Sequence, residues 1–148
     1  MTCAKALGCG VPVGAFVLGK KVADASLAPG DHGTTYGGNP FVCAAVSKVF
    51  DLYEKEQIVD HVKKVGGYLE KKLNALVEKY DFLKERRGKG LIQGLEVEGR
   101  PIGEIVNRGL EEGLIIITAG SNVLRFVPPL VVTEADVDEM IVKLEKCF

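Results

Sequence analysis

The sequence lacks the features that mark several large classes of protein. Its 148 residues include 19 basic and 20 acidic side chains, so no excess of positive charge points to nucleic acid. The longest apolar run, at residues 114–117, is far too short to cross a bilayer. The first residues show no basic, apolar and small-residue pattern of a secretory leader, and no internal repeat or low-complexity segment is visible. These absences favour a globular protein of the cytoplasm.

Paired cysteines and clustered histidines are also absent. Cys3, Cys9, Cys43 and Cys147 are scattered, with no Cys-x-x-Cys pair, and the chain has only two histidines. Neither residue type shows the ligand spacing of a zinc site. We therefore expect four free thiols, buried or partly buried, in a reducing compartment.

What the sequence does contain is globular composition, with 47% apolar and 26% charged residues. Its length suits one domain, or one domain and the end of another. Helical periodicity and capping signals predict helices over residues 20–25, 40–53, 58–80, 101–113 and 133–144. Apolar runs and alternation predict strands over residues 14–19, 91–97, 114–118 and 123–127, with loops at 26–40 and 86–90. This order predicts an α+β unit whose sheet is covered on one face by helices, joined to the preceding part near residues 49–56.

Lys5 is the first residue that could carry chemistry. It lies between two alanines, and glycines and a proline follow it and exclude a long helix. A lysine acts as a nucleophile only when desolvation or a neighbouring cation makes its ammonium easier to deprotonate. Small apolar neighbours are compatible with that environment, although an ordinary solvated lysine fits the same residues.

The loop at 26–40 contains the second candidate group, Thr34 and Thr35. Two hydroxyls on a glycine-flanked loop can bind an anion together with backbone N–H groups. The same pattern also fits turn residues that bond to their own backbone. His32, next to Asp31, does not make a nucleophilic triad, because a triad is defined by geometry in space. His61 lies between charged residues of the helix predicted over 58–80, so we expect it at the surface.

Arg125 is the third candidate, in a predicted strand that is otherwise apolar on both faces. No acidic residue lies within five positions before it or eight after it. A guanidinium there must bind an anion or reach water, because burying it unpaired costs several kcal/mol. The two possibilities are an anion site and an edge-strand arginine that reaches solvent.

Together these stretches resemble the class III pyridoxal-phosphate aminotransferases, and among them the acetylornithine aminotransferases most. The resemblance is carried by Ala4-Lys5-Ala6-Leu7-Gly8, by Gly10-Val-Pro-Val-Gly-Ala15, by His32-Gly-Thr-Thr-Tyr-Gly-Gly-Asn-Pro40 and by Leu124-Arg-Phe-Val-Pro-Pro-Leu130. It runs from the first residue to the last, but matches only the C-terminal part of such enzymes. It implies a fold-type I transferase, with residues 1–50 as the tail of the large cofactor-binding domain and residues 51–148 as the small α+β domain.

The resemblance also implies roles for individual residues. Lys5 matches the Schiff-base lysine and proton carrier, and Thr35 the hydroxyl that binds the phosphate of the partner subunit's pyridoxal 5′-phosphate. Thr34 would lie near the substrate, and Arg125 would hold the substrate α-carboxylate. A homodimer follows from these roles.

The implied reaction is transfer of the amino group of N2-acetylornithine to 2-oxoglutarate, giving glutamate, in arginine biosynthesis. Ornithine or another ω-amino compound is an alternative donor, and a non-catalytic folding or dimerisation module is an alternative of a different class. The family's ring-stacking, pyridinium-binding and further substrate-binding residues precede the lysine. We therefore expect Met1 to mark the edge of a cut, and the 148-residue chain alone to be inactive.

Overall fold

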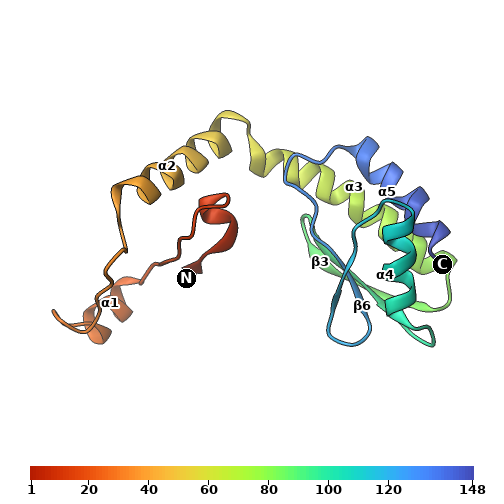
Figure 1. Ribbon diagram of the computed structural model, residues 1–148, viewed down its shortest axis with the longest axis horizontal. Coiled ribbons are helices and arrows are strands. Elements are labelled where there is room, and N and C mark those ends of the chain that lie inside the picture. Colours follow the sequence, from red (N-terminus) through yellow and green to blue (C-terminus); the bar gives the residue numbers. More distant parts are fainter. The chain divides into compact units, whose positions relative to one another are not determined.

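The chain divides into two structural units, Met1–Gln57 and Ile58–Phe148, in a computed structural model that describes residues 1–148. Figure 1 shows the elements of both units along the sequence. Each unit is described by itself.

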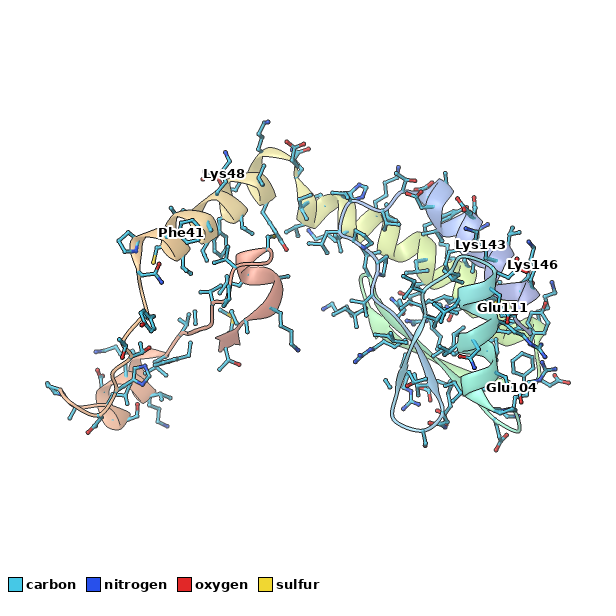
Figure 2. The ribbon with its side chains drawn as sticks, viewed as in Figure 1. Phe41, Lys48, Glu104, Glu111, Lys143 and Lys146 are labelled. Carbon is cyan, nitrogen blue, oxygen red and sulfur yellow. The ribbon has the colours of Figure 1, made fainter.

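The first unit contains short elements and one long helix. They are β1 (Thr2–Cys3), the 3-10 helix η1 (Lys5–Gly8), β2 (Ala15–Phe16), α1 (Lys20–Ser26) and α2 (Pro40–Lys55). β1 and β2 pair antiparallel, and α2 lies beside η1. Figure 2 shows Phe41 and Lys48 on α2, and both are exposed. The predicted start of a helix at Pro40 is confirmed. The predicted buried strand over 14–19 is wrong in burial, because a ribbon of two short strands has no layer to cover it and both residues of β2 are exposed.

The second unit is a four-stranded antiparallel sheet packed against helices. Its elements are α3 (Ile58–Lys79), β3 (Leu83–Lys89), β4 (Ile92–Val97), α4 (Ile102–Glu111), β5 (Ile117–Ala119), β6 (Val123–Phe126) and α5 (Glu134–Lys146). The strand order is β3-β4-β6-β5. All three helices contribute to one core with the sheet (Figure 1), through Leu69 and Leu73 of α3, Ile105 of α4 and Leu144 of α5. The predicted α+β architecture is confirmed.

The alternating side chains of β4 and β6 explain why only one face of the sheet is covered. Leu95 and Leu124 point into the core and have no exposed surface. Ile92 and Arg125 point to the opposite face and are exposed. This uncovered face, defined by the outward residues of β3, β4, β6 and β5, carries both apolar and charged side chains. On the outer surfaces of the helices, Figure 2 shows Glu104 and Glu111 along α4 and Lys143 and Lys146 along α5.

The glycine pair in α3 marks a close approach between two backbones. The helix continues through Gly66 and Gly67, as expected from the sequence. Gly66 is buried, and a Cβ at this position would lie 2.9 Å from backbone atoms of Gly90, in the turn between β3 and β4. The absence of a side chain at Gly66 therefore allows α3 to lie directly on this turn.

Two predictions about charged segments are wrong. Residues 86–90, predicted as a solvated basic loop, form the end of the edge strand β3 and its turn, because charged residues suit the exposed face of an edge strand. Arg86, on the inner face, donates to Glu70, Asn74 and Gln93, each at 2.8 Å. His61, predicted to be a surface residue, is half-buried, and its Nε2 lies 2.9 Å from the carbonyl oxygen of Val132.

The start of α5 has the predicted capping box. Thr133 Oγ1 accepts a hydrogen bond from the Asp136 backbone N–H at 3.2 Å, and the Asp136 carboxylate accepts one from the Thr133 N–H at 2.8 Å. The hydrogen bonds from the Thr133 hydroxyl and N–H lower the pKa of Asp136. Both orphan backbone donors at this end of the helix are thereby satisfied.

Two further carboxylates connect α5 to α3. Asp138 lies 2.6 Å from the Lys72 ammonium and accepts a hydrogen bond from the Tyr68 hydroxyl, and these two groups lower its pKa. Glu145 lies 2.6 Å from Lys79, which is the main cause of its lowered pKa. The two α5 carboxylates are thus held in their charged form by cations of α3.

All four thiols are free, as predicted, but their burial differs from the prediction. Cys147 is buried and Cys3 is half-buried, whereas Cys9 and Cys43 are exposed. Burial is the largest cause of the raised pKa of Cys147. No helix of the chain is both long and apolar enough to span a bilayer.

Candidate functional site

Lys5 begins the 3-10 helix η1 in an unusual backbone conformation. Its φ is 54°, in the left-handed region that side chains other than glycine rarely adopt. The turn that holds it is closed by backbone hydrogen bonds from Leu7 N to Ala4 O and from Cys9 N to Ala6 O. Non-glycine residues in this region are enriched at functional sites, because the surrounding structure must impose the strain.

A shallow, open pocket of about 420 Å³ lies beside Lys5. Its other lining residues are small or apolar, namely Ala6, Gly10, Val11, Pro12 and Val13. The Lys5 side chain itself is exposed. The apolar neighbours expected from the sequence are therefore present, but these residues leave the amine in contact with water.

The glycine that ends η1 is fixed by packing. Gly8 is buried, and a Cβ there would lie 2.6 Å from Cγ1 of Val13. The lysine turn and the Val11–Val13 segment could not approach so closely with any other residue at position 8. The glycine after the lysine therefore shapes the pocket wall.

Thr34 and Thr35 lie in the loop between α1 and α2, and both are exposed. The alternative prediction, that they bond to their own backbone, is not what the structure shows, since neither hydroxyl makes a hydrogen bond to another protein group. The Thr34 side chain instead packs against Gly37, where any Cβ would overlap its methyl group. Both hydroxyls are therefore available to a ligand.

Asn39 is a residue of this loop whose role was not predicted from the sequence. Its Oδ1 accepts a hydrogen bond from Val42 N at 3.0 Å and caps α2. Its Nδ2 donates to the Tyr36 carbonyl at 2.9 Å, which ties the loop to the helix end. An asparagine immediately before a helix-starting proline was the signal that could have identified this cap.

Arg125 lies in β6, which is a central strand between β4 and β5. The alternative prediction is therefore wrong about the edge strand, but the Arg125 side chain is exposed to solvent, as that alternative stated. Its side chain stands on the uncovered face of the sheet, where its cross-strand neighbours are Gly94 on β4 and Ile117 on β5. Gly94 has no side chain, and Cγ1 of Val123 lies 2.9 Å from the place that its Cβ would take.

Arg125 is the one arginine of five that has no partner within the chain. Each of the others makes a salt bridge or donates a hydrogen bond to a protein group: these are Arg86, Arg87, Arg100 and Arg108. A guanidinium offers five donors, and a ligand carboxylate can accept two of them in parallel. All five donors of Arg125 are therefore free of protein partners.

A carboxylate on the same face was not identified from the sequence. The two oxygens of Glu96 bind different partners: Oε2 lies 2.5 Å from Arg87 Nη2, and Oε1 accepts a hydrogen bond from Asn122 at 3.0 Å. Only the register of the sheet brings these residues together. Of the four residues predicted from the sequence, Lys5, Thr34 and Thr35 belong to the first unit and Arg125 to the second.

Comparison with known proteins finds relatives that share one name. The chain is 46% identical over 148 residues to an acetylornithine aminotransferase of Gloeobacter violaceus and 45% identical to one of Methanocaldococcus jannaschii. These matches cover 99% and 100% of this chain, but only 36% and 37% of the relatives. The chain thus spans a little over a third of the length of these curated relatives.

Solved structures show the same similarity. The acetylornithine aminotransferase of Elizabethkingia anophelis matches with a TM-score of 0.88 at 30% identity, covering 99% of this chain and 37% of its own. The ornithine aminotransferase of Toxoplasma gondii matches with a TM-score of 0.89 at 31% identity. This match covers 99% of this chain and 35% of the Toxoplasma chain. The family described as aminotransferase class-III matches residues 1–148. The chain therefore belongs to the class-III aminotransferase family.

Proposed function

We propose that this chain is the C-terminal part of an aminotransferase that transfers the amino group of N2-acetylornithine to 2-oxoglutarate in arginine biosynthesis. Relatives of that name match almost the whole chain at 45–46% identity. The structural observation that carries the proposal is Arg125, a guanidinium without a protein partner on an open sheet face. Donor, acceptor and both products carry carboxylates, which such a group binds.

The cofactor in this proposal is pyridoxal 5′-phosphate. A related amine transaminase from an uncultivated Pseudomonas species was solved with this cofactor bound, at 31% identity to this chain. The residues present fit the group: Lys5 offers an exposed amine on a strained turn beside a pocket, and Thr35 offers a hydroxyl that bonds to no protein atom. When bound, the cofactor supplies a conjugated ring that delocalises the electrons of the substrate carbon.

In this proposal, four residues of the chain have separate roles in binding and catalysis. Lys5 holds the cofactor covalently and, once released as a free amine, accepts and returns the proton of the substrate carbon. Thr35 donates a hydrogen bond to a phosphate oxygen, and Thr34 contacts the substrate. Arg125 holds the substrate α-carboxylate by two parallel hydrogen bonds and so orients the molecule.

The proposal also includes the division into domains and the oligomeric state. Residues 1–50 form the end of a large cofactor-binding domain and residues 51–148 the small domain. The whole protein is a homodimer in the cytoplasm, in which Thr35 reaches the cofactor phosphate of the partner subunit. The four cysteines are free thiols, and this supports the proposed cytoplasmic location, because thiols stay reduced there.

A second candidate donor is ornithine. The similarity to the Toxoplasma gondii ornithine aminotransferase, with a TM-score of 0.89, supports this alternative. The two activities are distinguished by measuring kcat/KM for N2-acetylornithine and for ornithine with the full-length protein. A ratio that favours ornithine would replace the proposed donor and leave the reaction class unchanged.

The roles of Lys5 and Arg125 are tested in the full-length protein. Borohydride reduction with the cofactor, followed by peptide mapping, is expected to label Lys5. Lys5→Ala is expected to lower kcat about a hundredfold or more, whereas the matched variant Lys20→Ala is expected to have no effect, because Lys20 is exposed and pairs only with Asp24. Arg125→Gln is expected to raise the Michaelis constants of both substrates about tenfold or more, since a charged hydrogen-bond pair is lost. Equal labelling of several lysines, or full activity of Lys5→Ala, would remove the basis of the proposal.

A further inference from the structure

Glu96 lies between two arginines on the uncovered face of the sheet. In the register of the strands, Gly94 of β4 pairs with Arg87 of β3 on one side and with Arg125 of β6 on the other. Glu96 is two positions further along β4 and points to the same face. It is therefore a diagonal neighbour of both arginines, at a separation of about 7–8 Å that long side chains can span.

The carboxylate of Glu96 is held from both neighbouring strands, by Arg87 of β3 and by Asn122 next to β6, but not by Arg125. Arg87 Nη2 lies 2.5 Å from Oε2, and the Asn122 side chain donates to Oε1 at 3.0 Å. Arg125, which is placed equivalently on the other strand, makes no salt bridge. Because Arg87 and Asn122 bind one oxygen each, both oxygens of Glu96 are already engaged.

We infer that Arg87 and Asn122 are positioning residues that keep Glu96 away from Arg125. A Glu96–Arg125 ion pair would occupy the guanidinium, and a substrate carboxylate would have to displace it before binding. With both oxygens of Glu96 bound by Arg87 and Asn122, the guanidinium of Arg125 is available in advance, and no ion pair must be broken. This inference rests on the proposed carboxylate-binding role of Arg125 and assigns a function to residues outside the motifs of the family resemblance.

Gly94 contributes to the same arrangement. It separates Arg87 from Arg125 in the cross-strand row and contributes no side chain of its own. A Cβ at this position would lie 2.9 Å from Cγ1 of Val123, the residue opposite Glu96. Gly94 is thus fixed by the packing of Val123, which stands on the same face as Arg125 in β6.

The test measures carboxylate binding by the full-length protein. The probe is glutarate, an unreactive dicarboxylate, and its Kd is measured by calorimetry, together with kcat and the Michaelis constant for the amino acceptor. Arg87→Gln is expected to raise the Kd and the Michaelis constant about three- to fivefold with kcat nearly unchanged, since an exposed ion pair must now be broken on binding. Arg87→Lys is expected to retain the wild-type Kd.

A double variant separates this effect from a purely structural one. Arg87→Gln combined with Glu96→Gln is expected to restore the wild-type Kd, because the competing carboxylate is gone. The matched control is Lys84→Gln, which removes a cation of β3 that pairs with Glu98 at 3.1 Å and does not contact Glu96. If Arg87→Gln does not fold, Asn122→Ala replaces it, with an expected rise of about twofold because one oxygen of Glu96 is released.

The outcomes distinguish the inference from the proposed function. If Arg125→Gln leaves the Kd of glutarate unchanged, the role of Arg125 is wrong and the inference fails with it. If Arg125→Gln weakens binding but neither Arg87→Gln nor Asn122→Ala does, the inference alone is overturned. It is also overturned if Glu96→Gln fails to rescue Arg87→Gln, because the loss then arises from the strand and not from the carboxylate.

Discussion

Alanine substitutions at Gly66 and Gly67 are expected to change stability in opposite directions. The two residues are adjacent in α3, and helix propensity treats them alike: alanine is favoured over glycine by about 1 kcal/mol in a helix interior. Gly67 is exposed, and a Cβ there meets nothing within 4 Å. Gly67→Ala should therefore stabilise the chain by about 0.5–1 kcal/mol.

Gly66→Ala should destabilise the chain. The added methyl would lie 2.9 Å from two backbone atoms of Gly90, and a backbone cannot rotate away as a side chain can. Gly90 itself has a φ of 59°, which ties this turn to glycine. Overpacking of this kind costs about 1–3 kcal/mol, so after the gain in propensity of about 1 kcal/mol the net loss is about 0–2 kcal/mol. The gain in propensity is common to both variants, so they should differ by the overpacking cost alone, about 1–3 kcal/mol.

Urea unfolding measures this difference. The chain has no tryptophan, so far-UV circular dichroism, which reports directly on the helices, is the suitable signal. With a slope of about 2 kcal/mol per molar urea, the midpoints of the two variants should lie about 0.5–1.5 M apart, with Gly67→Ala above the wild type and Gly66→Ala below it. Equal shifts in the same direction would show that α3 does not rest on the β3–β4 turn, and the reasoning from backbone contact would be refuted.

Two further predictions concern α5. Thr133→Ala should lower the free energy of unfolding by about 1 kcal/mol, because the capping box is lost, and Thr133→Ser should retain most of it; urea midpoints check both, and equal midpoints would contradict the cap. Stability should also fall in acid, because the pKa values of Asp138 and Glu145 are lowered in the folded chain. The unfolded chain then takes up protons first, so the stabilisation is complete above the ordinary carboxylate pKa of about 4 and is lost as the pH falls through the lowered values. Asp138→Asn should flatten the dependence of the urea midpoint on pH, and curves of identical shape for wild type and variant would exclude this contribution.

Much of the fold was predictable because its signals are local. The long helix α3 follows from apolar residues at spacings of three and four, and β4 from strict alternation. Pro40 and the Thr133 capping box marked helix starts because a cap involves residues within one turn of each other. The strand β3 was missed for the opposite reason: its inner residues include Arg86, whose three partners come from α3 and β4.

The candidate site was predictable only in part. The motifs around Lys5, Thr34, Thr35 and Arg125 identified residue types, and the roles assigned to them remain proposals. Their surroundings could not be derived in this way. The strained φ of Lys5 and the free hydroxyls of the loop depend on how the chain turns in space.

The sequence by itself determined the periodic elements, the helix caps, the family and the residues that could carry chemistry, because these depend on residue type and on neighbours within a few positions. Only the tertiary structure decided which glycine of α3 meets another backbone, and that Asn122 is the second partner of Glu96. Both depend on segments far apart in the sequence: Gly66 meets Gly90, and Glu96 meets Asn122 through the pairing of β4 with β6. Strand register and helix packing create these contacts, and neither is encoded in any single stretch of the chain.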